Sequence, residues 1–507
     1  MTGRASGVLL HLTSLPGRFG IGDLGNEASA WLDWLQVAGQ SIWQILPLGP
    51  PGQGDSPYDS QSAFAGNPLL ISPQKIRELG LIDDDLPQET SSIHPRVDFP
   101  RVAKWKSGLL RMAWTRLATR SPADDLPRRL REWAESPEQR VWLEDWSHYA
   151  ALKDRFSGQA WTTWPAAIRR RDPETVHQSR RQLADEIRYH EFVQFLFFEQ
   201  FQDLRVRARE RGIELLGDLP FYVAMDSCDV WTHPELFDLD EEGASLTVAG
   251  VPPDYFSETG QRWGNPIYRW DRLADEGYRW WLDRLGFQMG LVDRLRLDHF
   301  RGFAGYWQIP ASEPTAVVGQ WQTGPGYPFF AAVAQELGSL PFVAEDLGVI
   351  TPDVGELRLR MGIPGMRVLQ FAFDSPDSPH LPHRLSHDTA LFTGTHDNDT
   401  AQGWITAIDP EIRQRALAYV GGTEESFHWQ LLRSAQTSVA DLVIAPIQDV
   451  LGLDGDHRMN TPGTVDGNWG WRLPEGQLTE RLATDLRRLS EVTDRAPRPQ
   501  TDSQSHS

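Results

Sequence analysis

The sequence predicts an α/β fold, a (β/α)8 TIM barrel with inserted, mainly helical subdomains on the face at the carboxyl ends of its strands. First, the chain has 507 residues, of which 40% are hydrophobic, enough to bury a large core. Second, eight short apolar runs recur along it, and many close with polar, proline or glycine residues. Third, amphipathic helical patterns lie between many of these runs. Alternating strands and helices with polar strand ends are typical of this barrel, whose active site lies on that face.

The expected strands coincide with the eight short apolar runs. In chain order they fall at residues 7–16, 41–50, 213–221, 291–300, 340–348, 366–373, 389–397 and 441–449. Apolar residues recur at helical spacing in residues 28–39, 278–290 and 328–338, which predicts helices there. We therefore expect strand and helix to alternate through all eight units.

One catalytic barrel is expected to occupy residues 1–494, with two long insertions. The gap at 51–212, between the second and third strands, is far too long for one loop, and the gap at 222–290 before the fourth strand is also long. Each gap is expected to carry a subdomain or a lid. Charged, helix-favouring stretches at 122–146 and 179–204 are interpreted as solvated helix surfaces of the first insertion.

Charge and composition exclude several classes of partner. The chain has 49 basic and 70 acidic residues, a formal charge of −21, which argues against nucleic acid or an acidic membrane surface. The single cysteine, Cys228, cannot form an internal disulfide, and the first residues lack the long apolar core of a signal peptide. No stretch approaches the roughly 18 apolar residues of a membrane span. We expect a soluble cytoplasmic protein whose polar tail, residues 495–507, is disordered.

Three carboxylates stand at the ends of expected strands. Asp298 ends the fourth strand, Glu345 ends the fifth, and Asp397 ends the seventh. Each alone could simply cap the helix that follows its strand. A barrel, however, brings these strand ends together, and carboxylates in a partly apolar cleft shift one another's pKa.

Two carboxyl groups that flank an acetal carbon define glycoside chemistry. One attacks the sugar carbon while the other protonates the departing oxygen and then activates the incoming acceptor. Arg296 stands two residues before Asp298 and so on the same side of the strand, where its guanidinium could hold that carboxylate ionised and oriented. The charged cluster in LVDRLRLDHFRGF, residues 291–303, therefore suits a buried nucleophile with a fixed partner.

The motifs resemble those of a known family. RLDHFRGF, VAEDLGV and GTHDNDT are similar to strand-end signatures of the α-amylase superfamily. Longer stretches resemble its 4-α-glucanotransferase branch, the amylomaltases or disproportionating enzymes. These stretches lie at residues 11–25, 43–68, 217–231, 252–268 and 448–473.

The resemblance implies roles for the three carboxylates. Asp298 would be the nucleophile that forms a β-linked glucosyl-enzyme, Glu345 the general acid and then base, and Asp397 a stabiliser of the distorted sugar. Arg296 would orient Asp298, and His396 would form hydrogen bonds with sugar hydroxyls beside the scissile bond.

Two further positions match the family. Asp218, in GDLPFYV, corresponds to an active-site position, and Tyr58, in SPYDS, would stack its ring under the sugar. Trp263 is a separate candidate from the residues themselves, because a tryptophan between Gln261 and Asn265 in a long loop suits sugar binding.

Other nearby residues receive structural interpretations. His299 should point to the opposite face of the strand from Asp298 and pack as a structural histidine, and Asp346 and Asp399 alternate away from their neighbours toward loop or cap roles. His396, Asp397 and Asp298 could in principle ligate a divalent metal. The family needs none, and we predict no metal and no cofactor.

The function predicted is therefore 4-α-glucanotransferase, which transfers α-1,4-glucan segments between maltooligosaccharides or to glucose by a retaining double displacement. A hydrolase of α-1,4-glucans with the same carboxylate triad is the alternative. A non-catalytic glucan-binding protein and a metal-dependent barrel lyase or isomerase are further readings. No nucleic acid or membrane partner is expected, and the oligomeric state stays open.

Overall fold

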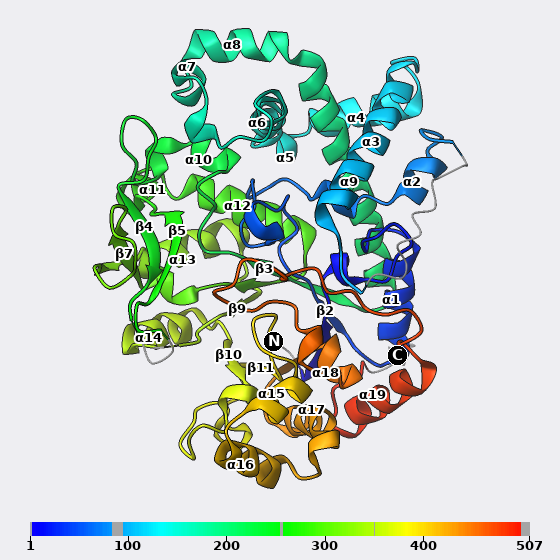
Figure 1. Ribbon diagram of the computed structural model, residues 1–507, viewed down its shortest axis with the longest axis vertical. Coiled ribbons are helices and arrows are strands. Elements are labelled where there is room, and N and C mark those ends of the chain that lie inside the picture. The colour runs from blue at the N-terminus through cyan, green and yellow to red at the C-terminus, as the bar shows by residue number, and fades with distance from the viewer. Residues whose placement is uncertain (1–2, 84–94, 254–256, 349, 498–507) are drawn as a thin grey trace, which may run out of the picture.

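The barrel is built from eight parallel strands. The computed structural model describes residues 3–83, 95–253, 257–348 and 350–497. The strands close in the order β1-β12-β11-β10-β9-β6-β3-β2. Their bounds are β1 Ala5–Leu9, β2 Ile42–Gln44, β3 Glu214–Leu219, β6 Arg294–Leu297, β9 Phe342–Ala344, β10 Gly365–Val368, β11 Thr389–Phe392 and β12 Leu442–Pro446. Each overlaps one of the eight predicted runs, so the predicted fold class is confirmed (Figure 1).

The strand interiors explain why these short runs suffice. Every residue of β11 and β12 is buried, as expected for parallel strands covered on both faces. Gly7 of β1 pairs with Ile42 of β2, and a Cβ at that glycine would lie 2.3 Å from the carbonyl oxygen of Ile42. Glycine therefore permits the close approach of the first two strands.

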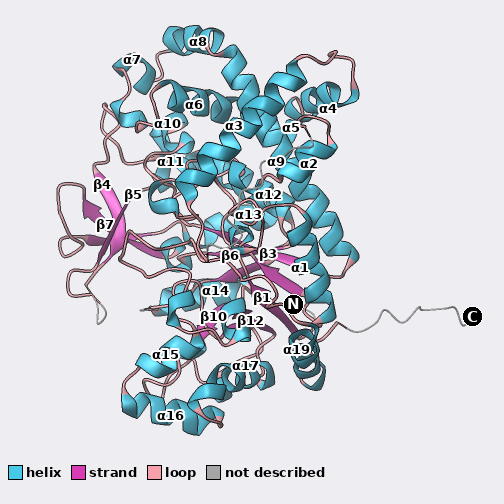
Figure 2. Cartoon of the chain, turned by 45° about the vertical axis from the view of Figure 1, so that its right-hand side comes forward, coloured by secondary structure: helices cyan, strands magenta, loops and turns pink. Residues whose placement is uncertain are grey.

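Helices cover the outside of the barrel (Figure 2). They are α1 Asn26–Val37, α12 Arg279–Leu291, α13 Gly326–Leu337, α14 Pro352–Met361, α15 Ala401–Ala407, α16 Pro410–Val420, α17 Phe427–Thr437, α18 Ile447–Leu451 and α19 Glu480–Val492. The three helices predicted by periodicity correspond to α1, α12 and α13. In α1, the buried side chains of Trp31, Leu32 and Leu35 recur at helical spacing and face the core.

The alternation of strand and helix fails in one unit. Between β10 and β11, all described, the chain has two 3-10 turns and no α-helix. Pro376, Pro379 and Pro382 fall in this segment, and prolines at this spacing remove backbone donors that a helix would need. The expectation of eight complete units was therefore wrong here.

The α-helices and 3-10 turns described between β2 and β3 are joined by loops, and residues 84–94 lie outside the described part. The helices are α2 Pro73–Glu78, α3 Phe99–Ala118, α4 Asp125–Ala134, α5 Pro137–Arg140, α6 Leu143–Arg155, α7 Ala166–Arg169, α8 Pro173–Gln182 and α9 Ala184–Glu210. Most of them stand together at one end of the molecule, whereas α15–α17 stand at the other (Figure 1). The long α9 returns to the barrel and packs against α1 and β3.

A second sheet lies beside the barrel. Its four strands, in the order β5-β4-β7-β8, pair antiparallel. They are β4 Thr247–Val251, β5 Gln261–Pro266, β7 Gly305–Pro310 and β8 Gln320–Thr323; α10 Cys228–Thr232 and α11 Trp270–Asp275 flank it in sequence. The sequence predicts mainly helical insertions and does not predict this sheet, of which β7 and β8 lie after both predicted insertions. Its strands are hard to recognise because β5 contains Gly264, which has a positive φ, and the register shifts between β4 and β5.

The chain end also departs from its prediction. Arg495, assigned to a disordered tail, is 1% exposed, and its guanidinium donates hydrogen bonds to five backbone carbonyls. Residues 498–507 of that tail lie outside the described residues. Within the described residues, no helix is long and apolar enough to cross a membrane.

Candidate active site

The candidate site is assembled where three neighbouring strands end. Asp218 of β3 pairs in register with Arg296 of β6, and β6 pairs in turn with β9. Asp298 and Glu345 each follow directly after the last paired residues of β6 and β9. Parallel register therefore brings together residues that lie far apart in the chain, such as Asp218 and Arg296, which are 78 positions apart.

Arg296 joins two of the carboxylates. Its Nη1 donates to both carboxylate oxygens of Asp218, at 2.7 and 2.8 Å, and lies 2.8 Å from Oδ1 of Asp298. The Arg296 side chain is 5% exposed, and that of Asp218 is fully buried. A buried guanidinium is stable only with such partners, because desolvation of an unpaired charge is very costly. Asp298 is the more accessible of the two carboxylates.

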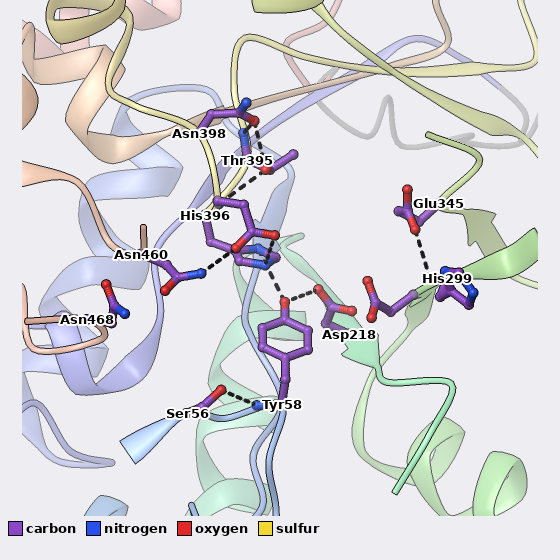
Figure 3. A network of polar contacts seen from close by, with 12 residues as sticks. Ser56, Tyr58, Asp218, His299, Glu345, Thr395, His396, Asn398, Asn460 and Asn468 are labelled. Carbon is purple, nitrogen blue, oxygen red and sulfur yellow. Dashed lines mark hydrogen bonds and ion pairs between the residues drawn. The ribbon is translucent and has the colours of Figure 1, made fainter. Parts of the chain in front are cut away.

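Glu345 is held by the backbone. Its Oε2 accepts a hydrogen bond of 2.9 Å from the N–H of His299 (Figure 3), and its Oε1 accepts one of 2.9 Å from the N–H of Leu347. Burial raises the pKa of Glu345 to about 8; Arg296 opposes the rise, and the charge of Asp298 adds to it. Glu345 is therefore largely protonated at neutral pH and can still ionise, as a group that both gives and takes a proton must.

A hydrogen-bond chain connects these groups with the loop after β11. The Tyr58 hydroxyl donates to Oδ2 of Asp218 at 2.8 Å and lies 3.2 Å from Nδ1 of His396 (Figure 3). Burial and the nearby Asp218 raise the pKa of Tyr58 well above its usual value, so the hydroxyl keeps its proton. Since that single proton is directed to Asp218, Nδ1 of His396 must be the donor toward Tyr58.

His396 therefore carries a proton on each ring nitrogen. Its Nε2 lies 3.3 Å from Oδ2 of Asp397, whose Oδ1 accepts a bond of 2.6 Å from Asn460. Burial alone would lower the pKa of His396, but Asp397 outweighs that effect and raises it. Likewise desolvation would raise the pKa of Asp397, but His396 and Asn460 hold it below its usual value. The half-exposed carboxylate of Asp397 is thus ionised and available in the cleft.

Trp263 and His299 lie outside this chain of hydrogen bonds. Trp263 is on β5, and its ring, 39% exposed, meets that of His299 edge-on with centroids 4.8 Å apart. Its indole N–H donates to Gln261. The His299 ring also contacts Phe221 and Tyr222, as a packed histidine would. Trp263 therefore lies beside His299, the residue that follows Asp298 and whose N–H bonds to Glu345.

Two flanking carboxylates do not enter the site. Asp346 is buried, ion-paired with Arg358 and Arg367, and accepts a hydrogen bond from the Met366 N–H. Asp346 therefore has a structural role, but it acts through ion pairs and not as the helix cap or loop residue that the sequence suggests. Asp399 accepts from the N–H of Thr400, at the start of α15.

The geometry of His396 bears on the possibility that His396, Asp397 and Asp298 bind a divalent metal. Both ring nitrogens already face protein partners, Tyr58 and Asp397. Among the residues that the structure describes, no group of three or more His, Cys, Asp or Glu side chains is arranged to hold a metal ion.

Two residues of the site escaped sequence reasoning. Trp469 packs its ring against those of Tyr58 and His396, at centroid distances of 5.7 and 5.8 Å, and Asn460 holds Asp397. Both belong to the 448–473 stretch, which was recognised as a motif without any residue being assigned. Trp469 has φ of 61°, so an unusual left-handed backbone directs it toward the site. Gly467 and Gly470, on either side of Asn468 and Trp469, were the sequence feature that could have indicated an unusual backbone here.

The arrangement can carry out chemistry at an acetal carbon. Asp298 beside a cation can attack, Glu345 can exchange a proton, and the ionised Asp397 can accept hydrogen bonds from sugar hydroxyls. Tyr58 and Trp469 provide aromatic surface near these groups.

Comparisons with known proteins agree along the whole chain. A family model described as 4-alpha-glucanotransferase matches residues 10–479. The chain is 46% identical over 505 residues to the 4-alpha-glucanotransferase of Thermus thermophilus, covering 97% of this chain and 99% of the relative. It is also 46% identical over 495 residues to that of Synechocystis sp., covering 96% and 97%. Among solved structures, an amylomaltase from Streptococcus agalactiae in complex with acarbose superposes with a TM-score of 0.93 at 38% identity, covering 97% of this chain and 100% of that chain.

Proposed function

Because the chain belongs to the 4-alpha-glucanotransferase family, we propose that it moves α-1,4-glucan segments between maltooligosaccharides, or to glucose, by a retaining double displacement. The observation that best supports this chemistry is the pairing at the ends of β6 and β9. There a carboxylate in contact with a guanidinium, Asp298, neighbours a carboxyl group that is protonated at neutral pH, Glu345. Such a pair provides a nucleophile and an acid in one site.

In the first step an oxygen of Asp298 attacks the anomeric carbon, and the bond between the anomeric carbon and the glycosidic oxygen breaks. The Glu345 proton passes to that departing oxygen, which leaves as the sugar hydroxyl of the released segment. In the second step the ionised Glu345 takes a proton from an acceptor hydroxyl. The acceptor oxygen then bonds to the anomeric carbon, and the bond to Asp298 breaks, which restores both carboxyl groups.

The remaining residues are assigned to binding. Asp397 would hold hydroxyls of the distorted sugar. His396 would form a hydrogen bond with a neighbouring hydroxyl through Nε2, once the sugar replaces the contact of this nitrogen with Asp397. Asp218 with Arg296 would fix the nucleophile, and Tyr58 would stack beneath a sugar ring. The acceptor sugar takes the place of the leaving group, next to the acid and base Glu345. Trp263 is exposed and contacts His299, whose N–H bonds to Glu345, so its ring is suited to stacking with the acceptor.

Transfer rather than hydrolysis requires that a sugar hydroxyl outcompete water at the second step. We propose that the segments at 51–68 and around Trp263 shield the glucosyl-enzyme and bind the acceptor.

We also keep the cytoplasmic location as a prediction. The Streptococcus agalactiae amylomaltase was solved with acarbose, and we expect acarbose to occupy the same cleft here.

Incubation with maltotriose alone tests the proposal. Transfer gives glucose together with a ladder of longer and shorter maltooligosaccharides, whereas hydrolysis gives only shorter sugars. Products that never exceed three glucose units would favour the hydrolase. The same reaction with a chelator examines the metal-dependent reading, since we expect the ladder to form unchanged.

A further inference from the structure

The residue after the proposed nucleophile has an unusual backbone. His299 adopts φ 49° and ψ 48°, the left-handed region, where a Cβ is strained. Histidine tolerates this region better than most residues other than glycine, and β-branched residues tolerate it poorly. In this conformation the N–H of His299 points across from β6 to Oε2 of Glu345, 2.9 Å away (Figure 3).

The His299 side chain is wedged among aromatic rings. Its ring contacts Trp263 edge-on at 4.8 Å, and Phe221 and Tyr222 at 6.1 and 6.2 Å. Burial lowers the pKa of His299 to about 4, Arg301 contributes in the same direction, and Asp298 opposes it. The imidazole is therefore neutral at working pH. Its Nε2 is shielded from solvent and has no hydrogen-bond partner among the described residues.

We propose that His299 is a positioning residue: the left-handed turn that it adopts after Asp298 directs its backbone N–H to Glu345 and so fixes that carboxyl group for proton transfer. The inference rests on the proposed function, because it assumes that Glu345 is the acid and base. It goes further by coupling the two reactive strand ends through one main-chain hydrogen bond.

The hydrogen bond from the His299 N–H also affects the protonation of Glu345. The charged groups around Glu345 are Arg296, Asp298 and Arg301, and the two N–H donors add to the attraction of the cations. A hydrogen bond donated to a carboxylate stabilises the ionised form and lowers its pKa. Loss of the His299 donor must therefore move the Glu345 pKa upward.

Three substitutions separate the turn from the ring. His299→Val strongly disfavours the left-handed turn. His299→Asn removes the aromatic ring but accepts this backbone, so it should keep the N–H in place. If His299→Val does not fold, His299→Ala replaces it, because alanine is also disfavoured at positive φ. Ser157→Val is the matched control: Ser157 has φ 53° on an exposed turn after α6, remote from the site.

Two readouts are measured for each variant. With maltotriose, we expect His299→Val to lower kcat/KM by about 10- to 100-fold and to shift the alkaline limb of its pH profile upward by about one unit. With α-maltosyl fluoride, whose leaving group departs without needing a proton, kcat/KM for fluoride release reports only the first step and should fall by no more than about threefold. His299→Asn should retain the wild-type limb, and Ser157→Val should change neither readout.

Other outcomes are decisive. An unshifted alkaline limb in His299→Val, or an equal loss with both substrates, would overturn the positioning role and leave only a packing role. The proposed function is judged separately, because it fails if the wild-type enzyme itself makes no maltotriose ladder. If the wild-type enzyme makes the maltotriose ladder but the alkaline limb of His299→Val is unshifted, only the positioning role of His299 is contradicted.

Discussion

Arg296 governs the charge distribution of the site. One nitrogen contacts both Asp218 and Asp298, and the guanidinium opposes the rise in the Glu345 pKa that burial causes. Three acidic groups thus lie around one cation. Because Asp298 is in direct contact with the guanidinium and Glu345 is not among its hydrogen-bond partners, the two carboxyl groups are suited to different roles.

Substitution of the two carboxyl groups should distinguish those roles. Asp298→Ala removes the nucleophile, so we expect a loss of kcat of about four orders of magnitude or more with every donor. Glu345→Gln retains the shape of the side chain but cannot give or take a proton, so kcat on maltotriose should fall by about three orders of magnitude. Circular dichroism and urea unfolding of both variants check that the fold is kept. Near-normal turnover by either one would contradict its assigned role.

The pH profile should report Glu345 directly. Its pKa is raised to about 8, so below that pH the group is protonated and ready to act as the acid, and above it the proton is lost. We expect kcat/KM for maltotriose to decline as pH rises through about 8. The Glu345→Gln variant should lack this decline in its residual activity. A wild-type profile that stays flat up to pH 9.5 would show that Glu345 does not supply the proton in the first step.

The strands of the barrel set how closely these residues can approach. Asp218 and Arg296 face each other only because β3 and β6 pair in register, and Glu345 N–H in turn bonds to the carbonyl of Leu297 at the end of β6. A change of register by one residue would direct these side chains to the other face of the sheet. The packing of each strand pair is therefore a condition for the site.

Gly7 tests this packing. Gly7→Ala places a Cβ 2.3 Å from a backbone oxygen of β2, so β1 and β2 must separate, and we expect the free energy of unfolding to fall by about 2–4 kcal/mol. Gly108→Ala is the matched control. Gly108 lies within α3, with no atom within 4 Å of the added methyl, so the change should stabilise by about 0.5–1 kcal/mol. Urea unfolding measures both, and equal effects would show that the space at Gly7 is not limiting.

The barrel could be predicted from the sequence, because each strand is a short apolar run that ends in polar or turn-forming residues. Asp298, Glu345 and Asp397 could be proposed for the same reason, since strand ends meet in a barrel. Contacts made by loops could not. Tyr58 and His396 are 338 residues apart, and their hydrogen bond depends on the path of two loops. Trp469 needs a left-handed backbone that no periodicity reveals.

Both chain ends contribute to closing the barrel. Arg495 donates to carbonyls of Ala5, at the start of β1, and of Ala440 and Asp441, just before β12. Arg4 donates to carbonyls of Gln436 and Ser438 in the same segment. The seam where the first strand meets the last, β1 against β12, is thus tied by two arginines at its amino-terminal edge.

Arg495→Ala should therefore destabilise the whole molecule. It removes the donors for five backbone carbonyls, most of which lie where water cannot easily replace them, and we expect the free energy of unfolding to fall by about 3 kcal/mol or more. Arg488→Ala, at an exposed position of the neighbouring α19, should change it by less than about 0.5 kcal/mol. Urea unfolding followed by tryptophan fluorescence compares them. Because the seam is remote from the carboxylates, kcat of Arg495→Ala measured well below its melting temperature should stay within about twofold of wild type. If Arg495→Ala is no less stable than Arg488→Ala, the bonds of Arg495 do not hold the barrel closed.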